Sequence, residues 1–182
     1  MLIRQVQSTD TALLADGFTP LSPQSRQMRF LMRKKELTPA ELRYFTDAGH
    51  HDHEALGALN HAGGRGVGIA RYIRHAEDPY AAEIAVTIVD DWQGQELGTG
   101  LLTRLTGGAR QEGIHRFTAL VADDDIALAG LLRKVLVRAG TAPWLRVRYG
   151  LGGAGTSIRS ASSRPRCQSD GPGRRRFRRR HG

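Results

Sequence analysis

The chain has 182 residues, enough for one domain with a hydrophobic core, and no apolar run approaches the roughly 20 residues of a membrane span. Its net charge of +9 comes from residues 141–182, whose 11 arginines and single acid leave 16 basic and 17 acidic residues in residues 1–140. Composition therefore excludes membrane insertion and gives no reason to assign a nucleic-acid partner to residues 1–140. The single cysteine, Cys167, excludes an internal disulfide, and without a signal-peptide pattern it favours a cytoplasmic location.

The first elements are predicted to be one strand and two short helices. Residues 2–6 alternate as a strand does. Residues 8–15 predict a helix that ends at Gly17, and a second helix is predicted over residues 22–31, where serine and proline mark its start.

The next helix has the clearest start in the sequence. Thr38 is suited to the N-cap and Pro39 to the first helical position, and Glu41 stands where a capping box has its acid. After this helix, residues 54–59 and 66–73 predict the two strands of a hairpin.

The rest of the chain alternates strands with longer helices. Strands are predicted over residues 82–89 and 117–121, the second mostly apolar and therefore central. The helix between them has an apolar face formed by Leu97, Leu101, Leu105 and Ala109. A last helix is predicted with a buried stripe formed by Ile126, Leu128, Leu131, Leu132 and Val135.

Residues 86–102 join a buried strand to a helix through a loop rich in glycine and glutamine. The backbone amides at such a helix start have no partner and carry the positive end of the helix dipole. A diphosphate binds well there, and small residues let it approach the main chain. The segment therefore predicts a cofactor site beside the last residues of the strand.

The centre of this segment reads Trp92-Gln93-Gly94-Gln95-Glu96-Leu97-Gly98-Thr99-Gly100-Leu101-Leu102. It resembles the acetyl-CoA-binding motif of the GNAT superfamily of N-acetyltransferases, Gln/Arg-x-x-Gly-x-Gly/Ala. The bare pattern fits from Gln95 to Gly100, whereas a longer register matches more positions, starts at Gln93 and puts Glu96 where the family has a glycine.

Other segments are similar to the catalytic domains of bacterial protein-lysine acetyltransferases, and the element order resembles the GNAT core over residues 2–136. These segments include Leu42-Arg43-Tyr44, Asp52-His53-Glu54-Ala55-Leu56 and Gly68-Ile69-Ala70-Arg71-Tyr72. The resemblance implies an α/β GNAT-like domain over residues 1–140, with a mixed, mostly antiparallel central sheet flanked by helices and incomplete C-terminal strands. No nucleotide-binding domain precedes it in this sequence, so we expect no cyclic-nucleotide control of the family type.

The activity that the resemblance implies is direct transfer of an acetyl group from acetyl-CoA to a primary amine, a protein lysine being one candidate. No metal is implied. The residues expected to bind acetyl-CoA are Ile88, Val89, Gln93, Gly94, Gln95, Glu96, Leu97, Gly98, Thr99 and Gly100.

Glu83 is the candidate general base, because it matches the glutamate that the resembling proteins use on this strand. Alternation puts its side chain on the opposite strand face from Ile84. The alternative is a structural role in which Glu83 pairs with Arg71 or Arg74 across the sheet. The backbone N–H at Ile88 is expected, by resemblance, to polarise the thioester oxygen.

Two features oppose efficient turnover. The tyrosine that many GNAT enzymes use as an acid is absent from residues 126–135, so water is the candidate acid. A Glu96 carboxylate about 5 Å from a phosphate costs about 1–3 kcal/mol, and less when it is turned to solvent. The alternative function is therefore a degenerate domain that binds acyl-CoA with little turnover.

Two further segments carry polar residues. In His50-His51-Asp52-His53 neighbouring side chains diverge, so a surface or groove role is favoured over a metal site. Residues 141–182 are rich in Arg, Gly and Ser, with one possible strand at residues 144–149. Otherwise we expect disorder and at most nonspecific nucleic-acid binding. A shifted reading frame is one hypothesis for the abrupt change in composition. Without a final strand, residues 117–121 would have an unpaired edge.

Overall fold

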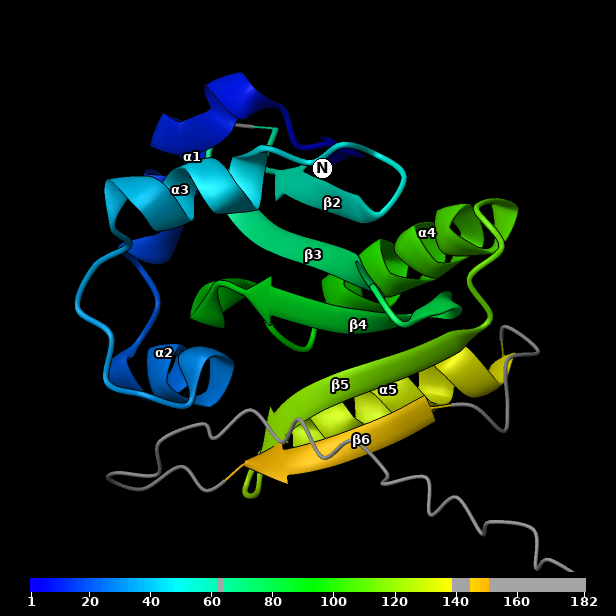
Figure 1. Ribbon diagram of the computed structural model, residues 1–182. Helices are drawn as coiled ribbons and strands as arrows, with labels where there is room; N and C mark the ends of the chain where they lie inside the picture. The colour runs from blue at the N-terminus through cyan, green and yellow to red at the C-terminus, as the bar shows by residue number, and fades with distance from the viewer. Residues whose placement is uncertain (62–63, 139–144, 151–182) are drawn as a thin grey trace, which may run out of the picture.

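A computed structural model describes residues 1–61, 64–138 and 145–150. Its strands form one sheet in the order β1-β2-β3-β4-β5-β6 (Figure 1). The strands are β1 (Leu2–Gln5), β2 (His53–Leu59), β3 (Gly66–His75), β4 (Asp78–Ile88), β5 (Arg116–Ala122) and β6 (Leu145–Gly150). The pairings from β1 to β4 are antiparallel, and those of β4 with β5 and β5 with β6 are parallel. The predicted mixed, mostly antiparallel sheet is confirmed.

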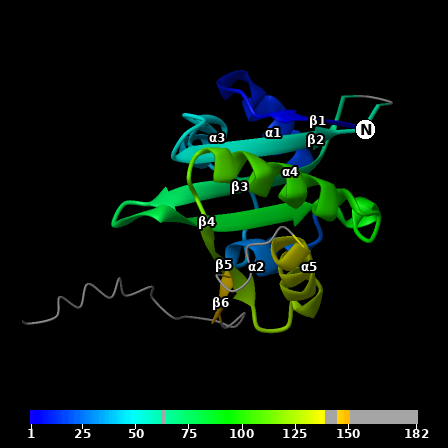
Figure 2. The same ribbon diagram turned by 90° about the vertical axis from the view of Figure 1, so that its right-hand side faces the viewer.

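Helices cover both faces of this sheet (Figures 1 and 2). On one face lie α4 (Leu97–Gln111) and α5 (Ile126–Arg138), and on the other α1 (Thr11–Phe18), α2 (Pro23–Phe30) and α3 (Pro39–Thr46). Short 3-10 turns occupy Ser8–Asp10 and Asp90–Trp92.

The main core lies between the sheet and α4 and α5. Tyr72, Ile84 and Phe117 project into it from the strands and are each 1% exposed. The predicted apolar face of α4 is confirmed, because Leu97, Leu101, Leu105 and Ala109 are no more than 1% exposed. No helix in the described part of the chain is long and apolar enough to cross a bilayer.

The helices on the other face depend on their caps. The Ser22 hydroxyl accepts a hydrogen bond from the Ser25 N–H (3.1 Å). At α3 the Thr38 hydroxyl accepts from the Glu41 N–H (3.3 Å), and the Glu41 carboxylate accepts from the Thr38 N–H (2.9 Å). The predicted capping box is therefore present, and it fixes where α3 begins.

Two expectations differ from the structure. The helix α1 continues past Gly17 to Phe18, because Gly17 provides close packing: a Cβ there would lie 3.1 Å from the Gly66 carbonyl oxygen. Ile126 is 81% exposed at the first residue of α5, so the predicted buried stripe is wrong at that position. The outer edge of β5 is paired with β6, at the one possible strand that the sequence offered. Residues 151–182, where disorder and nucleic-acid binding were predicted, lie outside the described residues.

Candidate active site

The strands β4 and β5 separate part-way along their length. Residues 81–83 of β4 pair with residues 116–118 of β5, whereas residues 84–88 of β4 continue beside β3 alone. Figure 1 shows the two strands diverging toward the side on which α2 lies. Glu83 is thus the last residue of β4 that pairs with β5.

The backbone of Ile88 faces this opening. The next residue, Val89, donates its N–H to the Val67 carbonyl on the β3 side (3.0 Å). Successive residues of a strand direct their amides to opposite sides, so the Ile88 N–H points away from β3 and toward the gap. The Ile88 carbonyl agrees with this direction, because it accepts a hydrogen bond from Nε2 of Gln93 (3.1 Å).

The gap opens into a cleft, called here the cofactor cleft, bounded by α2, the end of β4, the start of α4 and α5. It encloses about 1120 Å³, open solvent at its mouth included. The predicted cofactor residues that line it are Ile88, Gln93, Gly94, Glu96, Gly98 and Thr99. The structure adds lining residues that the motif did not indicate, including Ser25, Met28, Arg29, Leu128, Leu131 and Lys134.

The other predicted cofactor residues lie outside the lining of this cleft. Val89 packs with Phe18 in a separate apolar cluster. Gln95 donates to the Asp91 carbonyl and braces the loop (2.8 Å). Leu97 is buried in the main core, and Gly100 lies on the side of α4 that approaches β1.

The start of α4 offers free backbone donors beside the cleft. The first intrahelical bond of the helix is the Gly100 N–H to the Glu96 carbonyl (2.9 Å), so the amides of residues 97–99 have no acceptor within the helix. These amides and the helix dipole favour an anion at this end.

Glu96 caps this helix in the left-handed region, with φ of 61°, and makes no capping hydrogen bond with its side chain. Glycine adopts this angle without strain, in agreement with the register that puts Glu96 at a family glycine. The side chain is exposed, which places its electrostatic effect on a bound phosphate at the low end of the expected range.

Glu83 lies on the face of β4 opposite to the core. Its side chain is exposed, whereas Ile84 is buried beneath α4, as alternation predicted. The structural alternative is not seen in the described residues: Arg74 pairs with Asp52 (2.7 Å), and no ion pair joins Glu83 to Arg74 or Arg71.

A family model adds an independent observation to this geometry. The model of the Acetyltransferase (GNAT) family matches residues 22–136, which include the divergent strands and the start of α4. The chain belongs to the GNAT family. Acetyl-CoA is the co-substrate of this family.

Known relatives agree with the assignment. Acetyltransferase Pat of Mycolicibacterium smegmatis is 31% identical over 149 residues, covering 82% of this chain and 43% of Pat. Acetyltransferase PA5475 of Pseudomonas aeruginosa is 37% identical over 118 residues, covering 64% of this chain and 63% of the relative. The chain thus spans about half the length of these curated relatives. The crystal structure of the GNAT domain of S. lividans PAT superposes with a TM-score of 0.69 at 26% identity, covering 73% of this chain and 78% of that domain.

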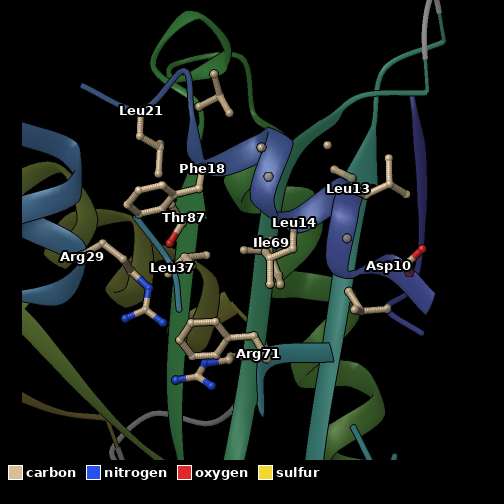
Figure 3. A pocket seen from close by; sticks show the side chains of 18 of the residues that line it. Asp10, Leu13, Leu14, Phe18, Leu21, Arg29, Leu37, Ile69, Arg71 and Thr87 are labelled. Carbon is tan, nitrogen blue, oxygen red and sulfur yellow. The ribbon is translucent and has the colours of Figure 1, made fainter. Parts of the chain in front are cut away.

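A second cavity of this GNAT domain was not predicted from the sequence. It lies between the sheet and α1, α2 and α3, with Arg29 and Arg71 projecting into it (Figure 3). We call it the arginine pocket. The rest of its lining is mainly apolar and includes Leu13, Leu14, Phe18, Phe30, Leu37, Phe45, Ile69 and Ala85. Arg29 and Thr87 line this pocket and the cofactor cleft, so the two cavities adjoin.

Burial is the main influence on both arginines. It lowers the pKa of Arg29 to about 10, with a further lowering from the charge of Arg71, and it lowers the pKa of Arg71 as well. Both groups stay cationic at neutral pH. The charge of Glu83 acts in the opposite direction on each of them, so the carboxylate lies within electrostatic range of both.

The histidine segment has separate partners for each side chain. His50 bonds Glu54 (3.1 Å), His51 bonds Glu112 (3.1 Å), and the ring of His53 lies against Tyr44. Burial lowers the pKa of His53, which keeps it neutral at pH 7. Within the described ranges no three His, Cys, Asp or Glu side chains are grouped to hold a metal ion.

Proposed function

We propose that the chain transfers an acetyl group from acetyl-CoA to a primary amine, with a lysine side chain of a protein as the leading acceptor. The observation that carries the proposal is the divergence of β4 and β5. It leaves the Ile88 N–H facing a cleft that begins at the free amides of α4, with Glu83 at the point of separation.

The residues present suit acetyl-CoA, which supplies its acetyl group as an activated thioester. The free amides of residues 97–99 match the charge of a diphosphate at a helix N-terminus. The Ile88 N–H is directed toward the gap, where it would donate to the thioester carbonyl and stabilise the negative charge that develops on that oxygen.

Glu83 is proposed to prepare the acceptor. It removes a proton from the acceptor ammonium, and the free amine then attacks the thioester carbon, so that a C–N bond forms while the C–S bond breaks. The nitrogen loses its second proton to water as the amide forms, and the leaving thiolate takes a proton from water, since a thiol pKa of about 8.5 makes it a fair leaving group. Among the described residues lining the cofactor cleft there is no tyrosine to do this.

A second function is favoured by Glu96 alone. A strained, negatively charged residue at the anion-binding end of α4 opposes cofactor binding, as expected of a domain that binds acyl-CoA with little turnover.

The test measures binding and turnover separately. Acetyl-CoA affinity is measured by calorimetry, and CoA release is followed with a thiol reagent in the presence of hexylamine or a lysine-containing peptide. Binding with amine-dependent release supports the acetyltransferase, whereas binding without release from any acceptor supports the second function. Failure to bind acetyl-CoA contradicts both.

Nucleic-acid binding through the arginine-rich residues 151–182 is a separate proposal. Truncation after Gly150 is expected to abolish any salt-sensitive affinity for a polynucleotide. Affinity that survives truncation would contradict a role confined to these residues.

A further inference from the structure

The arginine pocket holds two positive charges that the described residues leave without an ion pair. Arg29 comes from α2 and Arg71 from β3, and Figure 3 shows both side chains projecting into the same space. The other charged residues of the lining, Arg4 and Asp10, neutralise each other at 2.6 Å. The lining therefore carries a net positive charge from Arg29 and Arg71, which the single Glu83 carboxylate nearby offsets only in part.

The surroundings of Arg71 leave part of its guanidinium unsatisfied. Its guanidinium carbon lies 4.5 Å from the centre of the Phe45 ring and 5.4 Å from that of Tyr44. Its Nη1 is buried without a hydrogen-bond partner in the part of the chain that the structure describes. A buried donor without a partner is destabilising, and two like charges add repulsion. An anionic ligand would relieve both costs.

The position of the pocket connects it to the reacting groups. Arg29 and Thr87 line the arginine pocket and the cofactor cleft together. Glu83 projects on the same strand face as Ala85 and Thr87 and lies within electrostatic range of both arginines. An acceptor amine brought to Glu83 would place the remainder of the acceptor beside Arg29 and Arg71.

We propose that the arginine pocket binds a carboxylate of the acceptor, so that the preferred substrate is a primary amine that carries a carboxylate at the end of an apolar linker. This inference rests on the proposed function. The planar guanidinium groups match a carboxylate in a bidentate geometry, and the apolar lining matches the linker. The carboxylate has two possible sources: a free amino acid-like molecule, or an acidic residue next to a lysine in a peptide.

The experiment compares acceptors that differ only in the anion. The small-molecule arm uses 6-aminohexanoate against hexylamine, and the peptide arm uses a lysine flanked by glutamate against the same peptide with glutamine. The readout is the ratio of kcat/KM values within each pair, in the wild type and in Arg29→Gln, Arg71→Gln and Arg71→Lys. The matched control is Arg43→Gln, because Arg43 is exposed on α3 and lines neither cavity.

We expect the wild type and Arg43→Gln to favour the carboxylate by about 10-fold or more in at least one arm. Each Arg→Gln substitution is expected to reduce this ratio to within about twofold of unity, and Arg71→Lys to restore part of it. The arm in which the preference occurs identifies the source of the carboxylate. Equal ratios in the wild type, Arg29→Gln and Arg71→Gln would overturn the inference while leaving the acetyl transfer intact.

A binding measurement separates this inference from the proposed function. Hexanoate is titrated into the protein with CoA present and followed by NMR, with folding of each variant checked by thermal unfolding. Binding that is weakened about 10-fold by Arg71→Gln, and unchanged by Arg43→Gln, supports the carboxylate site even if no amine is acetylated. Hexanoate binding that is absent, or that neither Arg29→Gln nor Arg71→Gln weakens, contradicts the site.

Discussion

The two faces of β4 differ in how they are covered. Ile84 and Val86 are buried against α4 and α5 in a continuous apolar core, at 1% and 7% exposure. On the other face Glu83 is exposed, and Thr87 borders two cavities. The helices α1, α2 and α3 cover this face without filling it, and they leave Arg29 and Arg71 there without an ion pair among the described residues. Neighbouring residues of one strand therefore contribute to the core on one side and, in the proposed function, to the chemistry on the other.

The largest effect is expected from Glu83→Gln. The substitution keeps the size of the side chain and removes the proton acceptor, so kcat should fall by about 100-fold to 10,000-fold. Stability should change by less than about 0.5 kcal/mol, because the side chain is exposed. The control is Glu77→Gln, an exposed residue outside both cavities, which should leave kcat unchanged. A loss below about threefold in Glu83→Gln would remove Glu83 as the base.

The adjacent substitution Ile84→Ala should give the opposite pattern. Removing a side chain that is 1% exposed leaves a cavity beneath α4, so the free energy of unfolding should fall by about 2–5 kcal/mol. Chemical denaturation measures the loss, and acetyl transfer per folded molecule should stay within a few-fold of the wild type. A stable Ile84→Ala, or one that is folded but inactive, would contradict the division of the strand into two faces.

This division was predictable from the sequence, because side-chain alternation in β4 and helical spacing in α4 assign Ile84 and Leu101 to the core by local periodicity alone. The arginine pocket was not. Arg29 and Arg71 belong to different elements, and only the packing of α1 and α2 against the sheet brings them together. The prediction for Ile126 was wrong because the periodic pattern does not show that the first residue of a helix can remain exposed. The β4–β5 opening depends on strand twist and pairing, which no local pattern specifies.

Glu96→Gly should tighten acetyl-CoA binding in the cofactor cleft without affecting the Glu83 face of β4. Glycine removes the backbone strain of the left-handed angle. After the entropic cost of glycine in the unfolded chain is subtracted, this stabilises the folded chain by about 1 kcal/mol; the substitution also removes the charge. Because the carboxylate is exposed, acetyl-CoA should bind only about fivefold more tightly by calorimetry. The matched variant Glu96→Gln removes only the charge, so the difference in thermal stability between the two variants measures the backbone contribution, which acts on the free and the bound protein alike. No gain in affinity in either variant would show that Glu96 does not oppose the cofactor.

The smallest effect concerns α3, which supplies the Phe45 and Tyr44 rings beside Arg71 and is held by its cap. The ion pair with Lys34 (2.6 Å), followed by the Thr38 N–H bond, lowers the pKa of Glu41 to about 2 from an ordinary 4.5. The carboxylate therefore stabilises the fold fully above about pH 4.5, and this contribution disappears as the pH falls toward 2.

Partly exposed pairs of this kind contribute about 0.2–1 kcal/mol, so the test is a difference measurement. Thermal unfolding of the wild type and Glu41→Gln should differ at pH 6 and converge between pH 4.5 and 2, because glutamine keeps the capping geometry and loses only the charge. The pKa values of Asp10, Asp78 and Asp90 are also lowered, but these residues titrate equally in both proteins, so their contributions cancel in the difference. Because Glu41 caps α3, the loss of its charge in acid is expected to weaken the helix that contributes Phe45 to the arginine pocket. A difference between the two proteins that persists at pH 2 would contradict the assignment of this contribution to the Glu41 charge.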